Sequence, residues 1–442
     1  MSSTAASTKD SVAPSTWRKV SVRIIPLIGL AYVVSFTDRA NLGFIAAPMS
    51  RDLHLSSRQI GLAAGVFFIG YVLVEVPSNL LLRRFGARIW IARIMITWGL
   101  ITAATSAVNS AGTLFLARLL LGFAEAGLGA GILLYLTYWF PRRQRAWAMS
   151  LFILMTPISA IIGSPLAAAV LTWGQRVFGI TGWRALFLVE GLLTVVVSVL
   201  IFCFLPNRPR DARWLEPHER DGIENVIAAE AAEHRANGAL SGLWEALGSG
   251  RVWAMAVTWF TIAFGLYPLA YFLPTMIASI THSIGPAGDV SSVLLSAIPW
   301  AAAMVGLLIW ASLAARRSAV TATMIPMALG AVGLVLATLA SSGIPFVLAV
   351  CLSVTGIVCA MGQYWRIPAI GLTGAAAASG IALINSVSNL SGFVGPYITG
   401  WIETATGSFT YALLTIAILM AAGMLVLLTA GRRMEQLSGS RP

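Results

Sequence analysis

The sequence predicts an all-α membrane protein with twelve transmembrane helices, arranged as two six-helix bundles. Three observations support this fold class. The 442 residues are 58% hydrophobic and only 10% charged, with a mean hydropathy of +0.83, whereas soluble domains carry about 25% charged residues. The apolar residues form twelve separate stretches near the roughly 20 residues that a helix needs to cross a bilayer. One long polar segment divides these stretches into two groups of six.

Each predicted helix is a mostly apolar stretch, and most connections between them are short. The first six spans make up an N-terminal bundle at 21–205, and the last six make up a C-terminal bundle at 251–430. In chain order, the spans are 22–46, 58–81, 89–108, 112–137, 146–172, 184–205, 252–280, 290–314, 320–341, 344–368, 376–402 and 408–430. Because apolar stretches cover almost the whole length, a soluble domain with one anchor is excluded.

Three polar segments lie outside these spans. Residues 1–20 are rich in Ser, Thr and Ala and are predicted to be a disordered N-terminus. No small-residue cleavage site follows a short apolar core, so the first helix is retained and is not a signal peptide. Residues 206–250 form a linker, and 431–442 form a tail. The second half of the linker predicts a surface helix whose apolar side carries Ile223, Val226 and Ile227.

Arginine is distributed unevenly among the loops. The basic loops contain Arg83, Arg84, Arg88, Arg142, Arg143, Arg145, Arg208, Arg210, Arg213, Arg220, Arg316 and Arg317. The alternate loops are less basic, although Arg51, Arg58 and Arg176 occur there. By the positive-inside rule, both termini, the linker and the tail are expected in the cytoplasm, and the protein in the cytoplasmic (inner) membrane.

Composition and motifs exclude several classes of function. The formal net charge of +12 would suggest nucleic acid in a soluble protein, but here the basic residues lie in short loops, so the expected partner is the lipid bilayer. The three cysteines, Cys203, Cys351 and Cys359, lack metal-binding spacing. No nucleophile–base arrangement and no ATP-binding loop occurs. We therefore expect neither an enzyme nor a bound cofactor, and we expect a monomer.

Four charged residues stand out because they lie inside apolar spans. Arg118 and Glu125 are seven residues apart, which is roughly two helical turns, so they share one face about 10 Å apart along the axis. Asp38 and Arg39 are adjacent and therefore point about 100° apart on a helix. Such charges usually face an aqueous cavity or a partner. A guanidinium fits a carboxylate, and a carboxylate can take up a proton, so this set suits binding an anion together with a proton.

Several strings resemble the major facilitator superfamily and, within it, the anion:cation symporter family, in particular its tartrate, phthalate and hydroxyphenylacetate permeases. The similarity covers nearly the whole chain after residue 20. The matching strings are FTDRANLGF at 36–44, GVFFIGYVLVEVPSNLLL at 65–82, FLARLLLGFAEAGLGAGILLYLTYWFP at 115–141, LPNRPRDARWLEPHER at 205–220, YFLPTMI at 271–277 and GIALINSVSNLSGFVGPYITGWI at 380–402.

The resemblance implies a proton-coupled symporter that imports a small organic anion, such as a hydroxy, sugar or aromatic acid, by alternating access. It assigns proton coupling to Asp38 and Glu125, with protons as the coupling ion. It assigns substrate contacts to Arg118, Tyr71, Asn385 and Asn389. For the two asparagines, hydrogen bonding between helices is an equal alternative. Arg118 and Glu125 could also simply neutralise each other, and Asp38 and Arg39 could form a structural pair.

Two further sets of residues are candidates for contact with the substrate. Tyr267 and Tyr271 are four residues apart on a helix that Pro268 and Pro274 are expected to interrupt, and interrupted helices often line sites. Plain core packing of these tyrosines is almost as well supported. Arg366 is a second cation that could bind a second carboxylate, or its side chain could extend to the cytoplasmic surface.

The remaining charged residues within the spans have expected structural roles. Glu75 is predicted to form an ion pair with Arg93 of the next helix, and Glu190 is predicted to be structural. Arg39 either pairs elsewhere or belongs to a gate near one surface. Glycine and alanine spacing around Gly127 predicts close packing of a continuous helix.

Other functions remain as alternatives to import. An efflux antiporter for drugs or metabolites is the first of these. A non-transporting nutrient sensor is less well supported, because the tail after Ala430 is short. An integral-membrane enzyme lacks any supporting motif.

Overall fold

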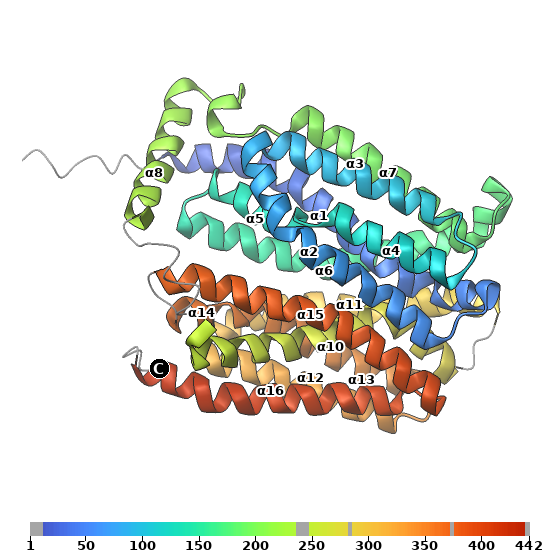
Figure 1. Cartoon of the computed structure of the whole chain (residues 1–442). Helices are drawn as coiled ribbons and strands as arrows, with labels where there is room; N and C mark the ends of the chain where they lie inside the picture. The colour runs from blue at the N-terminus through green and yellow to red at the C-terminus, as the bar shows by residue number, and fades with distance from the viewer. Residues whose placement is uncertain (1–11, 236–246, 282–284, 372–374, 438–442) are drawn as a thin grey trace, which may run out of the picture.

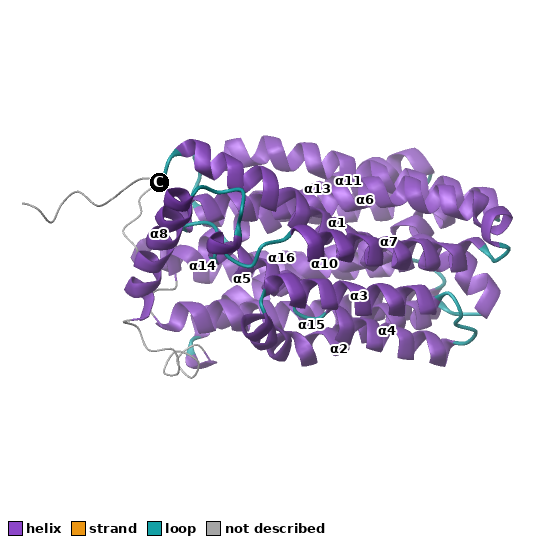
Figure 2. Ribbon diagram, turned by 90° about the horizontal axis from the view of Figure 1, so that it is seen from above, coloured by secondary structure: helices purple, strands orange, loops and turns teal. Residues whose placement is uncertain are grey.

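The computed structural model describes residues 12–235, 247–281, 285–371 and 375–437, and within these ranges all regular structure is helical (Figure 2). The N-terminal half contains α1 (Pro14–Leu53), α2 (Ser57–Phe85), α3 (Ala87–Thr105), α4 (Ala111–Glu125), α5 (Leu128–Thr137), α6 (Arg142–Phe178) and α7 (Gly182–Phe204). The linker contains the short 3₁₀ helix η1 (Pro209–Asp211) and α8 (Pro217–Arg235). The C-terminal half contains α10 (Gly250–Thr281), α11 (Pro286–Ala314), α12 (Ala319–Leu339), α13 (Gly343–Tyr364), α14 (Arg366–Gly371), α15 (Ala375–Thr406) and α16 (Thr410–Leu437).

The two halves lie side by side with their long helices running in similar directions (Figure 1). They meet mainly where α2 packs on α15, α6 on α11 and α1 on α10. Within the described residues, eleven helical segments are long and apolar enough to cross a membrane, with α4 and α5 counted as one, and α15 is the twelfth long helix. The predicted all-α fold of twelve helices is confirmed.

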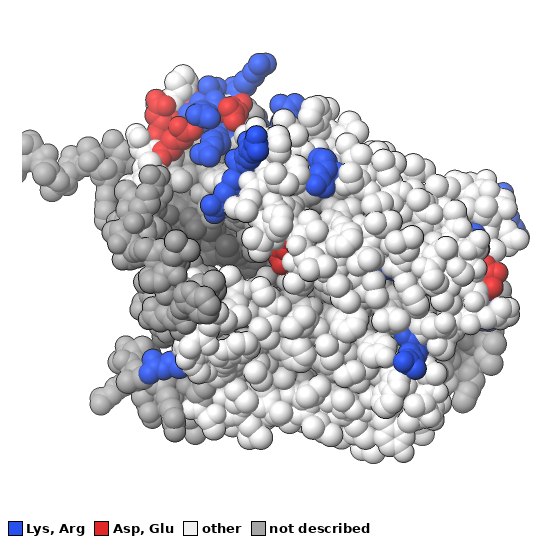
Figure 3. Space-filling view, viewed as in Figure 1, with Lys and Arg blue, Asp and Glu red and all other residues white. Residues whose placement is uncertain are grey.

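Few charged side chains lie on the surface between the two ends of the molecule (Figure 3). On the face shown in Figure 3, most lie at the end that carries α8, and a few lie at the opposite end. We call the first end the linker end, because α8 and the last turn of α16 lie there (Figure 1). The opposite end, which carries the loops α1–α2 and α15–α16, is called the far end.

The chain is ordered earlier than the sequence suggests. Helix α1 starts at Pro14, inside the segment predicted to be disordered, because its first turns are bound to the linker. Thr16 and Lys19 both donate to the carboxylate of Glu219 on α8, at 2.7 and 2.8 Å. The predicted surface helix is confirmed as α8, and its Ile223 is fully buried. Expectations for residues 1–11, 236–246 and 438–442 fall outside the described residues.

Helix breaks occur at different places from those predicted. The span expected at 112–137 is not continuous, because α4 ends at Glu125 and α5 begins after Gly127, whose φ is 88°. A side chain at Gly127 would also collide with Ser78 of α2. In contrast, α10 runs through Pro268 and Pro274 without interruption. Prolines are tolerated in such helices when neighbouring groups satisfy the freed carbonyls, whereas a left-handed residue ends a helix.

At the far end the two halves contact each other backbone to backbone. A Cβ atom added to Gly61 would collide with the carbonyl of Pro396, and one added to Gly400 would collide with that of Ser57. Gly65 lies equally close to Phe393. The α2–α15 contact therefore depends on the absence of side chains at these glycines.

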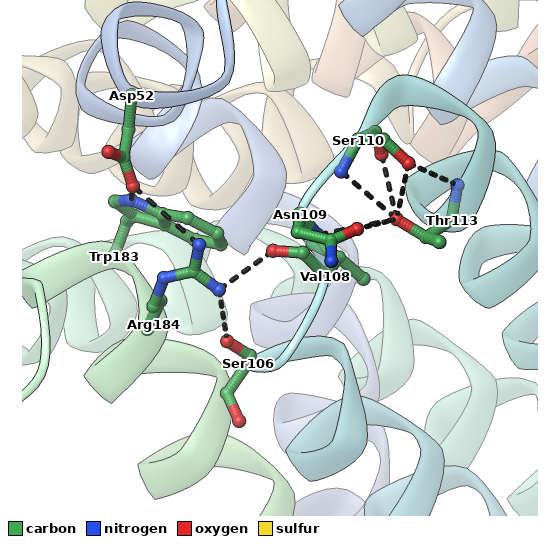
Figure 4. A network of polar contacts seen from close by, with 8 residues as sticks. All are labelled: Asp52, Ser106, Val108, Asn109, Ser110, Thr113, Trp183 and Arg184. Atoms are coloured by element: carbon green, nitrogen blue, oxygen red, sulfur yellow. Dashed lines mark hydrogen bonds and ion pairs between the residues drawn. The ribbon is translucent and has the colours of Figure 1, made fainter.

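Polar contacts surround this closed end. Arg51 of α1 forms a two-pronged ion pair with Asp289 of the other half. Within the N-terminal half, Arg184 donates to the carbonyls of Ser106 and Val108, at 2.7 Å each, and lies 3.8 Å from Asp52 (Figure 4). These contacts join the ends of α1, α3 and α7, so the far end of this half is fixed as one piece.

Candidate functional site

Five charged side chains from α1, α4 and α7 lie in the interior of the N-terminal half. Four are almost completely buried: Asp38, Arg118, Glu125 and Glu190, at 0–3% exposure. The fifth, Arg39, has a side chain that is 14% exposed. Charges are rarely placed in such an interior without a partner or a function.

Glu125 is paired with Arg39. Its Oε1 accepts from Nε of Arg39 at 2.8 Å and lies 2.7 Å from Nη2, and it also accepts from the Ser35 hydroxyl at 2.6 Å. The Arg39 guanidinium further lies 5.0–5.4 Å from three aromatic rings: Phe36, Phe67 and Tyr71. The sequence suggested Arg118 as the cation next to Glu125, but the structure shows that Arg39 neutralises this carboxylate.

Arg118 has no such partner. Its side chain is fully buried, and its Nε reaches only the Ala63 carbonyl, at 3.4 Å. The ring of Phe67 lies 5.2 Å away. Among the described residues, neither terminal nitrogen of Arg118 has a hydrogen-bond acceptor. These nitrogens are free to bind an anion.

Tyr271 places a hydroxyl from the other half near this guanidinium. It is 1% exposed, and the charge that acts on it most strongly is that of Arg118. Its hydroxyl also has no hydrogen-bond partner within the described ranges. Two unsatisfied donor groups, one from each half, therefore lie in the same region.

Asp38 faces away from Arg39, as their positions on one helix predicted. Its Oδ1 accepts from the Asn41 amide at 3.2 Å, and the same amide donates to Glu190 at 2.7 Å. Arg118 and Glu125 are the charges that act on Asp38.

The ion pair expected between Glu75 and Arg93 is not formed. Glu75 instead accepts from Asn389 of α15, at 3.2 Å, in a contact that joins the two halves. Arg93 lies over the ring of Trp90, 4.1 Å from its centroid. The two side chains point to different neighbours, so Glu75 belongs to the seam between the halves. Asn385, one turn before Asn389, is half-buried.

Tyr267 and Tyr271 line a small cavity between the halves, together with Arg39, Thr156 and Trp300. Its volume is about 30 Å³, which is room for roughly two water molecules and not for an organic acid. Tyr267 also packs edge-on against Phe68 of α2, at 4.7 Å. Admission of a substrate therefore requires the halves to move apart.

Arg366 lies at the end of a helix. Its guanidinium donates to the carbonyls of Ala314 and Arg317, at 3.0 and 3.1 Å, and to the Gln363 amide oxygen at 3.1 Å. Cations commonly satisfy the last carbonyls of a helix in this way. These contacts favour a structural role at the end of α11 over contact with a second carboxylate.

Three contributors to the site were missed in the sequence. Asn41 bridges two carboxylates, Ser35 donates to Glu125, and Phe67 lies against both Arg39 and Arg118. Asn41 could have been found, because it follows Asp38 by three residues and so shares its helix face. Nothing in the spacing marks Phe67, since α2 from Ile60 to Val74 contains only apolar residues, glycines and one tyrosine.

Comparisons with known proteins agree with this architecture. The profile of the Major Facilitator Superfamily matches residues 28–396. A protein of Agrobacterium vitis named "Putative tartrate transporter" is 39% identical over 96% of both chains. A "Quinolone resistance transporter" of Acinetobacter baumannii is 35% identical over 95% of both chains. A solved structure of the xylose transporter XylE from E. coli, described as partially occluded and inward open, has a TM-score of 0.72 at 15% identity and covers 92% of this chain and 97% of its own.

Proposed function

The chain belongs to the major facilitator superfamily and is a membrane transporter, not an enzyme, and we propose that it is a proton-coupled symporter importing a small organic anion. The proposed substrate is a carboxylate such as a hydroxy, sugar or aromatic acid. A relative named as a tartrate transporter supports this class. No cofactor is needed, because the proton gradient supplies the driving force.

The observation that carries this proposal is the unpartnered guanidinium of Arg118. A buried cation without an acceptor is costly, and its cost is relieved when an anion enters. The planar fork of arginine binds a carboxylate through two parallel hydrogen bonds. The Tyr271 hydroxyl, which also lacks a partner, supplies a third donor from the opposite half. A carboxylate bound to both would draw the two halves together.

Coupling is proposed to act through the carboxylates around this anion site. An anion at Arg118 cancels the positive charge that acts on Asp38, so Asp38 then takes up a proton more readily. Protonation of Glu125 would weaken its ion pair and leave the Arg39 guanidinium free beside the cavity. Proton and anion therefore favour each other's binding, which is the requirement for symport.

The distribution of basic loops also indicates how the protein is oriented in the membrane. We propose that the linker end faces the cytoplasm, because most basic loops lie there. The far end, where the halves are in backbone contact, would then face the outside. In this conformation the glycine contacts between α2 and α15 close the path from the outside.

The test is a comparison of two kinds of transport in proteoliposomes. We expect Glu125→Gln to abolish accumulation driven by a proton gradient, because the amide cannot exchange a proton. Exchange of labelled for unlabelled substrate should remain, because it needs no net proton movement. Accumulation against a gradient by this variant would show that Glu125 does not couple transport to protons.

Efflux by proton antiport is the second candidate, favoured by the 35% identity to a quinolone resistance transporter. The two functions predict opposite proton movements. In everted vesicles of known polarity, symport moves protons in the same direction as added substrate, and antiport moves them in the opposite direction. A pH-sensitive dye inside the vesicles separates the two.

A further inference from the structure

A carboxyl–amide–carboxyl chain is buried behind the proposed anion site. The two N–H groups of one amide serve two acids, since Asn41 donates to Asp38 at 3.2 Å and to Glu190 at 2.7 Å. Exposure of the three side chains is 1%, 0% and 3%. Asp38 and Asn41 lie on α1, while Glu190 comes from α7, so the chain joins two helices of the N-terminal half.

Unpartnered polar atoms surround the hydrogen-bonded group of Asp38, Asn41 and Glu190. Oδ2 of Asp38, Oδ1 of Asn41 and Oε1 of Glu190 have no donor among the described residues. On the other side of Asp38, the fully buried side chains of Trp98 and Thr102 face its carboxylate from α3 and can donate to it. Asp38 is therefore surrounded by donors that favour its ionised form, whereas Asn41 is the donor that Glu190 receives.

The charges around the two acids are different. Asp38 is acted on by Arg118, which attracts a negative charge, and by Glu125, which repels it. Asp38, linked to Glu190 through the Asn41 amide, is the charged group next to it, and no described cation lies within ion-pair distance of Glu190. Two ionised carboxylates so close together in an interior of low dielectric repel each other strongly. Only Asp38 has a cation that offsets this repulsion.

We propose that Glu190 stays protonated throughout the transport cycle and acts as a positioning residue that, through Asn41, sets how readily Asp38 binds its proton. This inference rests on the proposed function, in which Asp38 exchanges a proton. Asp38 is the group that cycles, and Glu190 provides a neutral acceptor for one N–H of the bridging amide. That acceptor holds the Asn41 amide at 2.7 Å, which leaves its hydrogen bond to Asp38 at the longer 3.2 Å.

A neutral Glu190 determines the net charge of the buried cluster. With Glu190 neutral, the ionised Asp38 balances Arg118, and Glu125 balances Arg39, so the empty cluster carries no net charge. One proton on Asp38 leaves one positive charge, which one carboxylate of the substrate neutralises. The proton on Asp38 and one substrate carboxylate therefore add no net charge between them, whereas the proton that Glu125 exchanges in the proposed function adds one positive charge. Transport of a monocarboxylate should then carry two protons and one positive charge for each anion.

The experiment compares two changes at Glu190 for their effect on the pH dependence of uptake. Glu190→Gln keeps a neutral acceptor of the same shape, so uptake and its pH profile should match those of the wild type. Glu190→Ala releases the Asn41 amide from its 2.7 Å contact, so that it can turn towards Asp38 and shorten the 3.2 Å hydrogen bond, which favours the ionised form of Asp38. Half-maximal uptake should then move about one unit towards acid pH, the size expected for one hydrogen bond to a charged group.

Other outcomes would overturn the inference. If Glu190→Gln loses proton-driven accumulation but keeps exchange, Glu190 itself cycles. If Glu190→Ala lowers the melting temperature with no change in pH profile, Glu190 is only structural. Should either variant fail to fold, infrared spectroscopy that compares the wild-type protein with the Asn41→Leu variant gives a second test. The carbonyl band of a buried protonated carboxyl should be present at neutral pH and change frequency in Asn41→Leu; an unchanged spectrum contradicts the proposal.

Failure of this inference can be told apart from failure of the proposed function. Asp38→Asn should abolish proton-driven accumulation if the function is correct, whatever the role of Glu190. Accumulation by Asp38→Asn would instead remove the basis of both proposals.

Discussion

The two halves of the molecule contribute differently to the interior where they meet. The N-terminal half places five charged side chains there, on α1, α4 and α7. Near the cavity the described part of the C-terminal half provides hydroxyl, amide and aromatic groups, notably Tyr267, Tyr271 and Asn389. Its buried acid, Asp289, lies at the far end, paired with Arg51.

This difference separates two tasks. The N-terminal half carries the groups that can exchange protons and bind an anion. The C-terminal half provides neutral hydrogen-bond donors and aromatic side chains, so its role is to complete and close the site. If this division is correct, changes in the first half should alter coupling and affinity strongly, and changes in the second should alter affinity moderately.

The largest expected effect is the loss of anion binding in Arg118→Gln. Removing one partner of a buried charge contact costs on the order of 2–5 kcal/mol, so substrate affinity should fall by about 30-fold or more. Isothermal titration with the purified protein and a panel of carboxylates measures this. Arg93→Gln is the matched control, because Arg93 lies over the ring of Trp90 on its own helix and contacts no residue of the anion site, so affinity should be unchanged. Equal affinities for both variants would contradict the assignment of Arg118.

A smaller effect is expected from the opposite half. Tyr271→Phe removes one donor to the bound carboxylate, and a hydrogen bond to a charged group contributes about 1.5–3 kcal/mol. Substrate affinity should therefore fall by about 10- to 150-fold, while the pH profile of uptake should be unchanged. Tyr411→Phe, at an exposed position on α16, serves as the control. A shifted pH profile in Tyr271→Phe would break the proposed division between the halves.

The third effect concerns the far end. Asp289→Asn removes the ion pair with Arg51, whose side chain is 47% exposed, so the contribution is at most about 1 kcal/mol. The far end should open a few times more often. Maleimide labelling of Ser292→Cys, in a protein whose native cysteines are changed to serine, reports this opening, because Ser292 is buried one turn after Asp289 on α11. Unchanged labelling would mean that the glycine contacts alone keep this end closed.

The smallest effect is expected at the linker end. The hydrogen bonds that Glu219 accepts from Lys19, the Glu216 amide and Thr16 lower its pKa from 4.5 to about 2. Glu219→Gln should lower the melting temperature by no more than about 2 °C at neutral pH. A depressed pKa stabilises the fold above the unfolded value, so the difference from the wild type should be constant above about pH 5 and shrink as the pH falls towards about 2. Glu216→Gln, which is largely exposed, should show no such trend.

The fold could be predicted from the sequence, but several partners in the site could not. Twelve apolar spans and a central linker follow from composition alone. The pairing of Arg39 with Glu125 joins residues that are 86 positions apart, and it depends on how α1 is rotated against α4. The break at Gly127 was missed because glycine spacing also indicates close packing. Whether such a glycine marks a helix break or a close helix contact is decided by tertiary packing, which cannot be read from a single sequence.

Charged residues in apolar spans were nevertheless the informative signal. Asp38, Arg118 and Glu125 were selected on that basis, and all three are buried together in one half. The partner of Glu75 could not be predicted in this way, since Glu75 is bonded to Asn389 and not to the cation expected on the next helix. The roles of these residues in transport stay predictions that the experiments above can test.

The glycine contacts between α2 and α15 bear on how tightly transport is coupled. At Gly61, Gly65 and Gly400 the two helices approach so closely that not even a methyl group fits, so a file of water molecules cannot pass through these contacts. Protons cross membranes along such files, and slippage of this kind would dissipate the gradient without carrying cargo. A methyl group at Gly61 should hold the two helices apart, so that a carrier of this kind would become a slow proton leak.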